Sequence, residues 1–208
     1  MVGAAKHQCL DAGISFTAQH MQHACALRLL HDCVILTVIT HLSNLPPTHS
    51  HTAEGLAYIH DMNVLHCDFC VGNLLVASDL SIKLCDFQGR LLNRNGDISL
   101  NGGAAESVMS SMPRPDRNHC DRKTDIFAFG TALYFIMTGH SPFPNLDTID
   151  DEDEIRRQYE QCEFPCIAPY QGGEVIYKCW KGGYQSAADI MSNLIALEER
   201  KSSISIPC

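Results

Sequence analysis

The amino-acid sequence predicts a mainly α domain of the α+β class, in which helices pack around one central buried helix and a small β-hairpin lies at one edge. Three observations support this prediction. The run from Ile126 to Met137 is almost wholly apolar, two short apolar runs flank the turn-rich letters "SDL" at 78–80, and later segments place apolar residues at helical spacing. The chain has 208 residues, 45% of them hydrophobic, which suffices for one domain with its own core.

Composition and charge exclude several classes of partner. The formal net charge of −9 disfavours attraction to nucleic acid or to anionic lipid. The most apolar run, Cys33 to Ile39, is far shorter than the roughly 20 residues that cross a bilayer. The chain opens without a secretory signal, and its eleven cysteines are irregularly spaced and odd in number. We therefore expect a cytoplasmic protein that binds neither nucleic acid nor membrane.

Residues 1–51 are the least patterned part of the chain, and we expect them to form a poorly specified N-terminal segment. They hold seven of the eleven histidines and lead into "SNLPPTHSH", where Pro46 and Pro47 exclude a continuing helix. From Thr52, a suitable capping residue, apolar residues recur at helical spacing, which predicts a short helix that ends near Asn63.

The next two elements are a hairpin and a loop. The runs "NLLVA" (73–77) and "SIKLC" (81–85) predict two paired strands, with Lys83 facing outward. Residues 88–123 are rich in Gly, Ser, Asn and Pro, which predicts one long loop, and such loops are usually functional.

Helices dominate the remainder. The central helix begins near Asp125 and ends at Gly139, and "LDTIDDEDEIRRQYEQ" (146–161) begins with acids and continues with bases, the order that a helix dipole favours. Ser186 and Asp189 form a capping-box pattern at the start of a last amphipathic helix. The domain is expected to span 52–200, with a tail at 201–208.

Three polar residues around the hairpin indicate chemistry. Asp68 and Asn73 precede its first strand and Asp86 follows its second strand, so the hairpin is expected to bring all three to one edge. Phosphoryl transfer needs divalent metal held against phosphates and a carboxylate beside the attacking hydroxyl. Two acids and an amide are a minimal set for that reaction.

The same residues carry a resemblance to a known family. "HCDFCVGN" (66–73) resembles the H-R-D-x-x-x-x-N catalytic loop of eukaryotic protein kinases, and "CDFQG" (85–89) resembles their D-F-G segment. In the same order follow "PRPD" (113–116) at the place of A-P-E, "DIFAFG" (125–130) at the start of the central large-lobe helix, and "TGHSPF" and "KCW" further on. Several of these segments are similar to kinase-like proteins of fungi. The resemblance covers about residues 52 to 200 and implies a protein-kinase-like large lobe, the C-lobe.

The resemblance also implies a role for each site residue. Asp68 would accept the proton of the substrate hydroxyl, and Asn73 and Asp86 would bind the metal ions of Mg²⁺-ATP. His66 would pack structurally against the loop, and Asp125 would accept hydrogen bonds from the backbone of the catalytic loop. ATP and Mg²⁺ are thus the implied cofactors, and serine or threonine of a protein is the implied acceptor.

Four positions depart from the family pattern. Cys67 replaces the arginine that in many kinases pairs with a phosphorylated loop, and Cys70 replaces the lysine that contacts the transferred phosphate. Gln88 stands where glycine is usual. Asp116 replaces the glutamate of A-P-E, with no arginine near Tyr184 to pair with it.

The two cysteines of the loop also allow a metal interpretation. Structural zinc needs four ligands, and Cys67 and Cys70 have no second cysteine pair at comparable spacing, since Cys162 and Cys166 flank Pro165 and fit poorly. We therefore interpret Cys67 and Cys70 as substituted kinase positions.

The family pattern also includes a small N-terminal lobe with a Gly-rich loop, a strand lysine and a helix glutamate, none of which is found in this sequence. Lys6 in "VGAAK" is a look-alike without a Gly-rich strand before it. Three hypotheses follow: an ATP-dependent phosphotransferase that uses Asp68, Asn73 and Asp86, a pseudokinase-like interaction module that has lost catalysis, and a truncated gene product. We expect the truncated chain to be weak or inactive as an enzyme. A missing N-lobe would expose apolar area near Leu74 and Leu75, which predicts self-association or coverage by residues 27–42.

Overall fold

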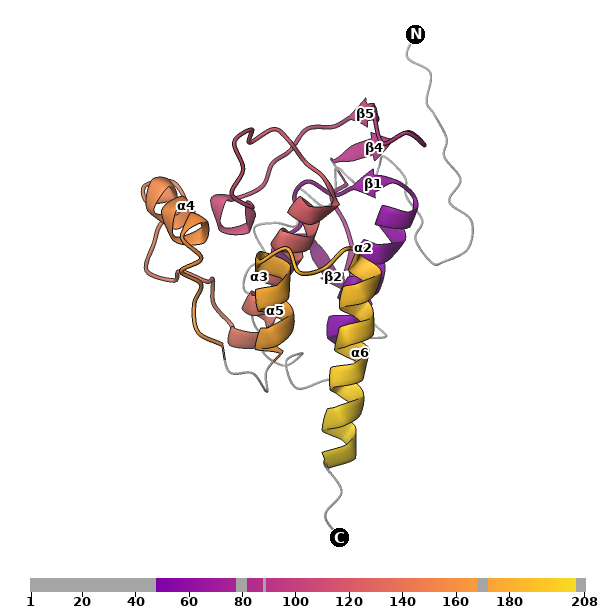
Figure 1. The fold of residues 1–208 in the computed structure, drawn as a ribbon, viewed down its shortest axis with the longest axis vertical. Coiled ribbons are helices and arrows are strands. Elements are labelled where there is room, and N and C mark those ends of the chain that lie inside the picture. Colours follow the sequence, from indigo (N-terminus) through magenta and orange to yellow (C-terminus); the bar gives the residue numbers. More distant parts are fainter. Residues whose placement is uncertain (1–47, 78–81, 88, 168–171, 205–208) are drawn as a thin grey trace.

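The helix α3 (Arg122–Thr138) lies at the centre of the fold, as the apolar run predicts (Figure 1). The computed structural model describes residues 48–77, 82–87, 89–167 and 172–204, and in it every residue from Ile126 to Tyr134 is buried. Asp121 caps the helix by accepting hydrogen bonds from the amides of Lys123 and Thr124, and Gly139 ends it in the left-handed conformation with φ of 78°.

Four further helices of the described residues surround α3. They are α2 (Thr48–Asp61), α4 (Glu152–Glu160), α5 (Gly173–Trp180) and α6 (Ala187–Ile204). The helix α2 packs along α6, although more than a hundred residues separate them in sequence, and α5 packs on α3 (Figure 1). The indole of Trp180 on α5 donates a hydrogen bond to Thr131 Oγ1 on α3 at 3.1 Å.

Two helix starts differ from the sequence prediction. The helix α2 begins at Thr48, before the expected capping residue Thr52. The helix α4 begins only at Glu152, because the carboxylate of Asp147 accepts the amides of Ile149 and Asp150 in a turn. These backbone hydrogen bonds lower the pKa of the Asp147 carboxyl. The capping box before α6 is present, since Ser186 and Asp189 exchange side-chain to backbone hydrogen bonds.

The predicted hairpin is confirmed. The strand β2 (Leu74–Val76) pairs antiparallel with β3 (Ile82–Leu84), so that Leu74 lies opposite Leu84 and Leu75 lies opposite Lys83. Lys83 is partly exposed, Leu74 is buried, and Leu75 and Val76 are exposed. Residues 27–42, which were expected to cover this face, lie outside the described residues, and so does Lys6. Self-association through this face stays a prediction.

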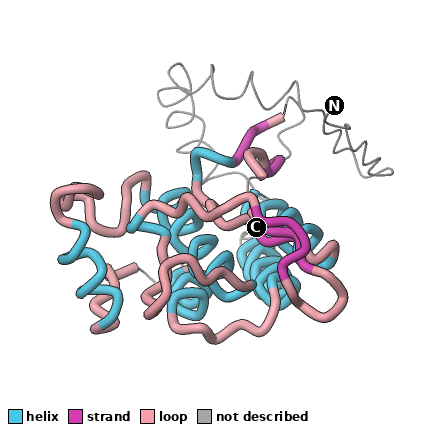
Figure 2. The backbone as a smooth tube through the Cα atoms, turned by 90° about the horizontal axis from the view of Figure 1, so that it is seen from above, coloured by secondary structure: helices cyan, strands magenta, loops and turns pink. Residues whose placement is uncertain are grey.

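The expectation of one long loop over 88–123 is wrong. The strands β4 (Arg90–Leu92) and β5 (Ile98–Asn101) pair with each other, and β1 (Val64–Leu65) adds to β4, which makes a second, three-stranded antiparallel sheet. The polar letters "NRNGD" form the hairpin turn, in which Asn93 Oδ1 accepts the amides of Asn95 and Asp97. Figure 2 shows the two small sheets as separate groups of strands beside the helices.

No helix in the described part of the chain combines the length and the apolar character that a bilayer span requires.

Candidate active site

The carboxylate of Asp125 connects the central helix to the loop that carries Asp68. Asp125 is fully buried in the first turn of α3. Its Oδ2 accepts the amide of His66 at 2.8 Å and its Oδ1 accepts the amide of Cys67 at 2.9 Å. The kinase resemblance implies these contacts, and they fix the backbone immediately before Asp68.

His60 completes the shell of donors around Asp125. Its Nε2 lies 3.0 Å from Asp125 Oδ2, and because a carboxylate accepts, His60 donates this hydrogen bond. The backbone carbonyl of His60 accepts in turn from Arg122 Nη2 at 2.8 Å. Sequence reasoning assigned no role to His60, which falls at helical spacing with the apolar residues Leu56 and Ile59. A histidine on the apolar face of a helix indicates that its ring has a hydrogen-bond partner in the core, but the sequence pattern does not identify that partner as Asp125.

His66 joins the loop to the segment that carries Asp86. The side chain is fully buried, and its Nε2 donates to the carbonyl of Cys85 at 3.1 Å. The ring packs against Phe69 and Phe87 with centroid separations of 5.6 and 5.2 Å. His66 therefore touches both the loop and the segment that carries Asp86, and the structural role that the resemblance implies for it stays a prediction.

Asp68 and Asn73 are in direct contact. Asn73 Nδ2 donates to the backbone carbonyl of Asp68 at 2.8 Å and to its carboxylate oxygen Oδ2 at 3.2 Å. Asn73 is buried at the end of the 3₁₀ helix η1 (Val71–Asn73), and Asp68 is partly buried. The amide nitrogen of Asn73 is thus used within the loop, and a metal ion at this residue would have to bind the oxygen Oδ1.

Asp86 lies at the same end of the β2–β3 hairpin as Asn73. Asn73 directly precedes β2, Asp86 follows β3 by two residues, and the first residue of β2 pairs with the last residue of β3. The amide of Cys85 donates to the carbonyl of Asn73 at 3.0 Å, which ties the two ends together. The hairpin therefore places the two metal-binding candidates beside each other, and their roles stay predictions.

Backbone strain gathers at these positions. Cys67 has φ of 59° and Asp86 has φ of 61°, a left-handed conformation that non-glycine residues seldom adopt. Each such residue costs of the order of 1–3 kcal/mol and persists where surrounding contacts hold it, which occurs most often at functional sites. The amide of Cys67 donates to Asp125, and the amide of Cys85, the residue before Asp86, donates to the carbonyl of Asn73.

Gly89 presses directly against the catalytic loop. A Cβ atom at this position would lie 1.8 Å from the carbonyl oxygen of Leu65 and 2.5 Å from that of His66. Only a residue without a side chain fits there. The next residue, Arg90, is buried, and its Nε donates to Asn101 Oδ1 at 3.0 Å. This hydrogen bond joins β4 to β5.

A buried ion pair organises the segment after β5. Arg114 Nη2 lies 2.6 Å from Glu106 Oε2, and Arg114 also donates to the carbonyls of Met112 and Arg117. Burial raises the pKa of the Glu106 carboxyl, and the Arg114 guanidinium partly opposes this. Sequence reasoning found no arginine partner for Asp116, and in the structure Asp116 accepts the amide of Asn118 instead.

A groove of about 310 Å³ lies beside the loop of Asp68. Its walls come from the loop itself, the segment before and within η2 (Val108–Ser110), the helix α3 and the turn after it. The residues that line it include Cys70, Val71, Gly72, Ser107, Met109 and Phe135.

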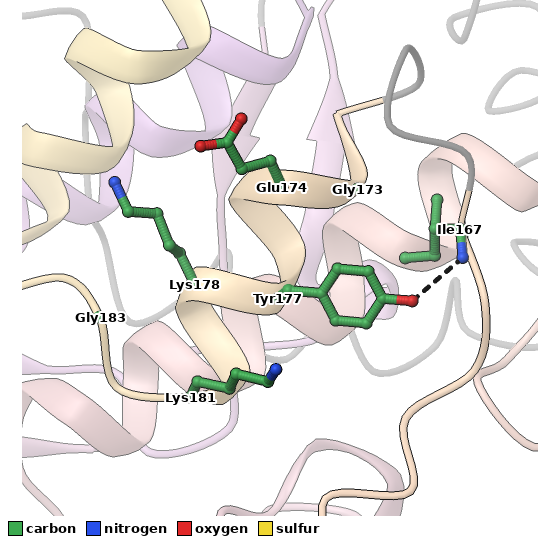
Figure 3. A pocket seen from close by; sticks show the side chains of 7 residues that line it. All are labelled: Ile167, Gly173, Glu174, Tyr177, Lys178, Lys181 and Gly183. Atoms are coloured by element: carbon green, nitrogen blue, oxygen red, sulfur yellow. Dashed lines mark hydrogen bonds between the residues drawn. The ribbon is translucent and has the colours of Figure 1, made fainter.

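A second cavity, of about 490 Å³, lies at α5 and is lined by none of the candidate site residues (Figure 3). The hydroxyl of Tyr177 accepts there from the amide of Ile167 at 3.2 Å, and the ammonium of Lys178 lies over the ring of Tyr184.

Comparison with known proteins points to one family. The family model described as protein tyrosine and serine/threonine kinase matches residues 14–190. The match begins within the segment 1–51 that the sequence pattern set apart, and the boundary at residue 52 stays a prediction.

Individual relatives are similar at modest identity. The chain is 29% identical over 132 residues to the tyrosine-protein kinase Srms of Mus musculus, covering 62% of this chain and 26% of that protein. It is 29% identical over 131 residues to the tyrosine-protein kinase Abl of Drosophila melanogaster, covering 62% of this chain and 8% of Abl. It is 28% identical over 94 residues to the mitogen-activated protein kinase kinase kinase dlk-1 of Caenorhabditis briggsae, covering 45% of this chain and 11% of that protein. The chain thus spans about a quarter or less of each.

The contacts of Asp125 predict a difference between two aspartate substitutions. Asp125→Ala leaves the amides of His66 and Cys67 buried without acceptors, and we expect it to lower the free energy of unfolding by roughly 1–3 kcal/mol more than Asp68→Ala does. Asp68 is partly exposed, and water can replace the side-chain amide of Asn73 that its carboxylate accepts. Denaturant midpoints measure both variants, and the reverse ranking would contradict the role of Asp125.

The close approach of Gly89 predicts a second stability effect. We expect Gly89→Ala to destabilise the domain by about 1–3 kcal/mol, because the added methyl group overlaps two backbone carbonyls that cannot move independently of the loop. Gly72→Ala is the matched control, since a Cβ there meets only Cys70 Sγ at 3.7 Å, an ordinary contact. Urea titration compares the two variants, and equal midpoints would refute the tight fit.

Proposed function

The chain belongs to the protein tyrosine and serine/threonine kinase family, and we propose that it keeps the family's phosphotransfer groups while transfer by the 208-residue polypeptide is weak or absent. The observation that carries this proposal is the hydrogen-bonded pair of Asp68 and Asn73 with Asp86 at the adjacent end of the hairpin. These are the acid, the amide and the second acid that phosphoryl transfer requires.

The residues fit Mg²⁺-ATP by their donor chemistry. Mg²⁺ prefers oxygen ligands and is usually bound by one or two carboxylates together with substrate phosphates. The carboxylate of Asp86 and the amide oxygen of Asn73 would supply such ligands. In the described part of the chain no group of three or more His, Cys, Asp or Glu side chains could hold a metal ion by itself. Binding of the metal together with a nucleotide suits this site better than binding of the metal alone.

In this proposal Asp68 orients the acceptor hydroxyl. Bound ATP would supply the phosphoryl group, with Mg²⁺ neutralising its oxygens. Asp68 would accept the hydroxyl proton, and its carboxylate is oriented by Asn73 Nδ2 and by the backbone that Asp125 binds. The adjoining groove of about 310 Å³ would accommodate the peptide that carries the hydroxyl.

Two features support weak transfer. Cys70 brings no positive charge to the place where the family pattern has a lysine, and removal of one preorganised charge typically costs a factor of about 10²–10³ in rate. The 208 residues also contain no Gly-rich loop followed by a strand lysine, the groups that cover and hold the nucleotide.

The substitutions at Cys67 and Cys70 favour a second candidate function, a pseudokinase-like module that binds a partner without phosphotransfer. Serine or threonine stays the predicted acceptor class. Two of the relatives above carry the name tyrosine-protein kinase, so tyrosine peptides belong in every assay beside serine peptides.

The weak site predicts a small response to nucleotide. A ligand that binds only the folded state with a dissociation constant of about 1 mM contributes roughly 0.4 kcal/mol at 1 mM. In a chain of this size that raises the thermal midpoint by less than about 2 °C. We expect unfolding with and without Mg²⁺-ATP to differ by no more than this, and radiolabelled phosphate transfer to serine and tyrosine peptides to stay near background.

Asp86→Asn is the control for this measurement, because it removes a metal-binding carboxylate and keeps the side-chain volume. A rise of several degrees in the unsubstituted chain that disappears in Asp86→Asn would contradict weak binding and would show an efficient nucleotide site. Unchanged transfer in Asp86→Asn, at a rate above background, would refute the assigned site.

A further inference from the structure

Two buried cysteines from separate segments meet beside the catalytic loop. Cys67 directly precedes Asp68, and Cys120 directly precedes Asp121, the residue that caps α3. With Leu65 they form a small buried cluster, separate from the main core, against which Leu92 packs. Cys67 is 1% exposed and Cys120 is 8% exposed, and both are reduced thiols in this structure.

The surroundings of the pair are unequal. The Cys67 thiol donates a hydrogen bond to Cys120, which keeps the proton on Cys67, and burial acts in the same direction; together they raise the pKa of Cys67. The same hydrogen bond lowers the pKa of Cys120, and the positive charges of Arg90 and Arg114 add to this, while burial and Glu106 oppose it. Arg114 Nη2 lies 3.9 Å from Cys120 Sγ. Because the guanidinium of Arg114 lies beside Cys120 and favours its thiolate, we assign Cys120 as the attacking sulfur and Cys67 as its partner.

We propose that Cys67 and Cys120 are a peroxide-sensitive thiol pair that oxidises to a disulfide between the catalytic loop and the start of α3. The Cys120 thiolate attacks one oxygen of hydrogen peroxide, which gives a sulfenic acid and, after protonation of the leaving hydroxide, one water. Cys67 sulfur then attacks the sulfenic sulfur, loses its proton, and releases a second water as the disulfide forms. Two thiols are oxidised by two electrons in total, and one peroxide is reduced to two waters.

The disulfide would act on the site through the backbone of Cys67. This residue already has φ of 59° and donates its amide to Asp125, so a covalent bond to Cys120 adds a second link between the loop and α3. Such a bond would make the position of Asp68 depend on the redox state. The inference concerns the thiols themselves and holds whether or not the chain transfers phosphate.

Peptide mapping of the whole chain tests the pair. The purified protein, at low concentration, is treated with hydrogen peroxide at about 1 mM, in excess over the protein thiols. It is then alkylated and digested with trypsin without reduction. The peptide 118–122 contains Cys120 as its single cysteine. We expect it to be linked to peptide 29–83, with fragment ions that place the bond at Cys67, in a chain that stays monomeric on a non-reducing gel and loses the link with dithiothreitol.

Internal and variant controls make the result specific. Cys179 is buried in the main core, where burial raises the pKa of its thiol, and we expect it to stay reduced under the same treatment. Cys166→Ser removes an exposed thiol and should leave the link unchanged, whereas Cys120→Ser should leave Cys67 as an alkylatable thiol. A Cys120 that stays reduced, pairs with a different cysteine, or is linked only between chains would overturn the proposal.

Discussion

The buried carboxylate of Asp125, at the start of the central helix, binds the backbone of the catalytic loop directly. A fully buried carboxylate is costly unless donors surround it, and here two backbone amides and the His60 imidazole do so. Because Asp125 lies in the first turn of α3, the most buried helix, the position of the loop is set by the core. The loop cannot move without leaving a buried charge without its partners.

The geometry of the site follows from this contact in two steps. Asp125 fixes the amides of His66 and Cys67, and the His66 ring then reaches the carbonyl of Cys85, the residue before Asp86. The β2–β3 hairpin joins the same two segments from the other side. Two independent links therefore bring Asp68 and Asp86 together, and they hold Cys67 and Asp86 in a conformation that neither residue prefers.

Local pattern predicted the helices and one of the two hairpins, and it failed for most contacts between the elements. The central helix, the β2–β3 hairpin and the capping box at Ser186 could be predicted, because each depends on residues within a few positions. The β4–β5 hairpin was missed because its turn letters also suit a loop. Three contacts depend on the tertiary fold, which the periodicity of the sequence does not report. They are the ion pair of Glu106 with Arg114, the hydrogen bond of His60 to Asp125, and the contact of Cys67 with Cys120.

Amide hydrogen exchange of the catalytic loop tests the role of Asp125 most directly. In Asp125 the two loop amides bind different carboxylate oxygens, so in Asp125→Asn, which keeps the side-chain volume, the NH₂ group replaces the oxygen that faces one of these amides. We predict that the amides of His66 and Cys67 exchange about 5-fold to 150-fold faster in the variant, the range that follows from losing roughly 1–3 kcal/mol of local stability. A peptide from α6 should exchange as before. Unchanged protection of His66 and Cys67 in a folded Asp125→Asn protein would contradict the claim that Asp125 holds the catalytic loop.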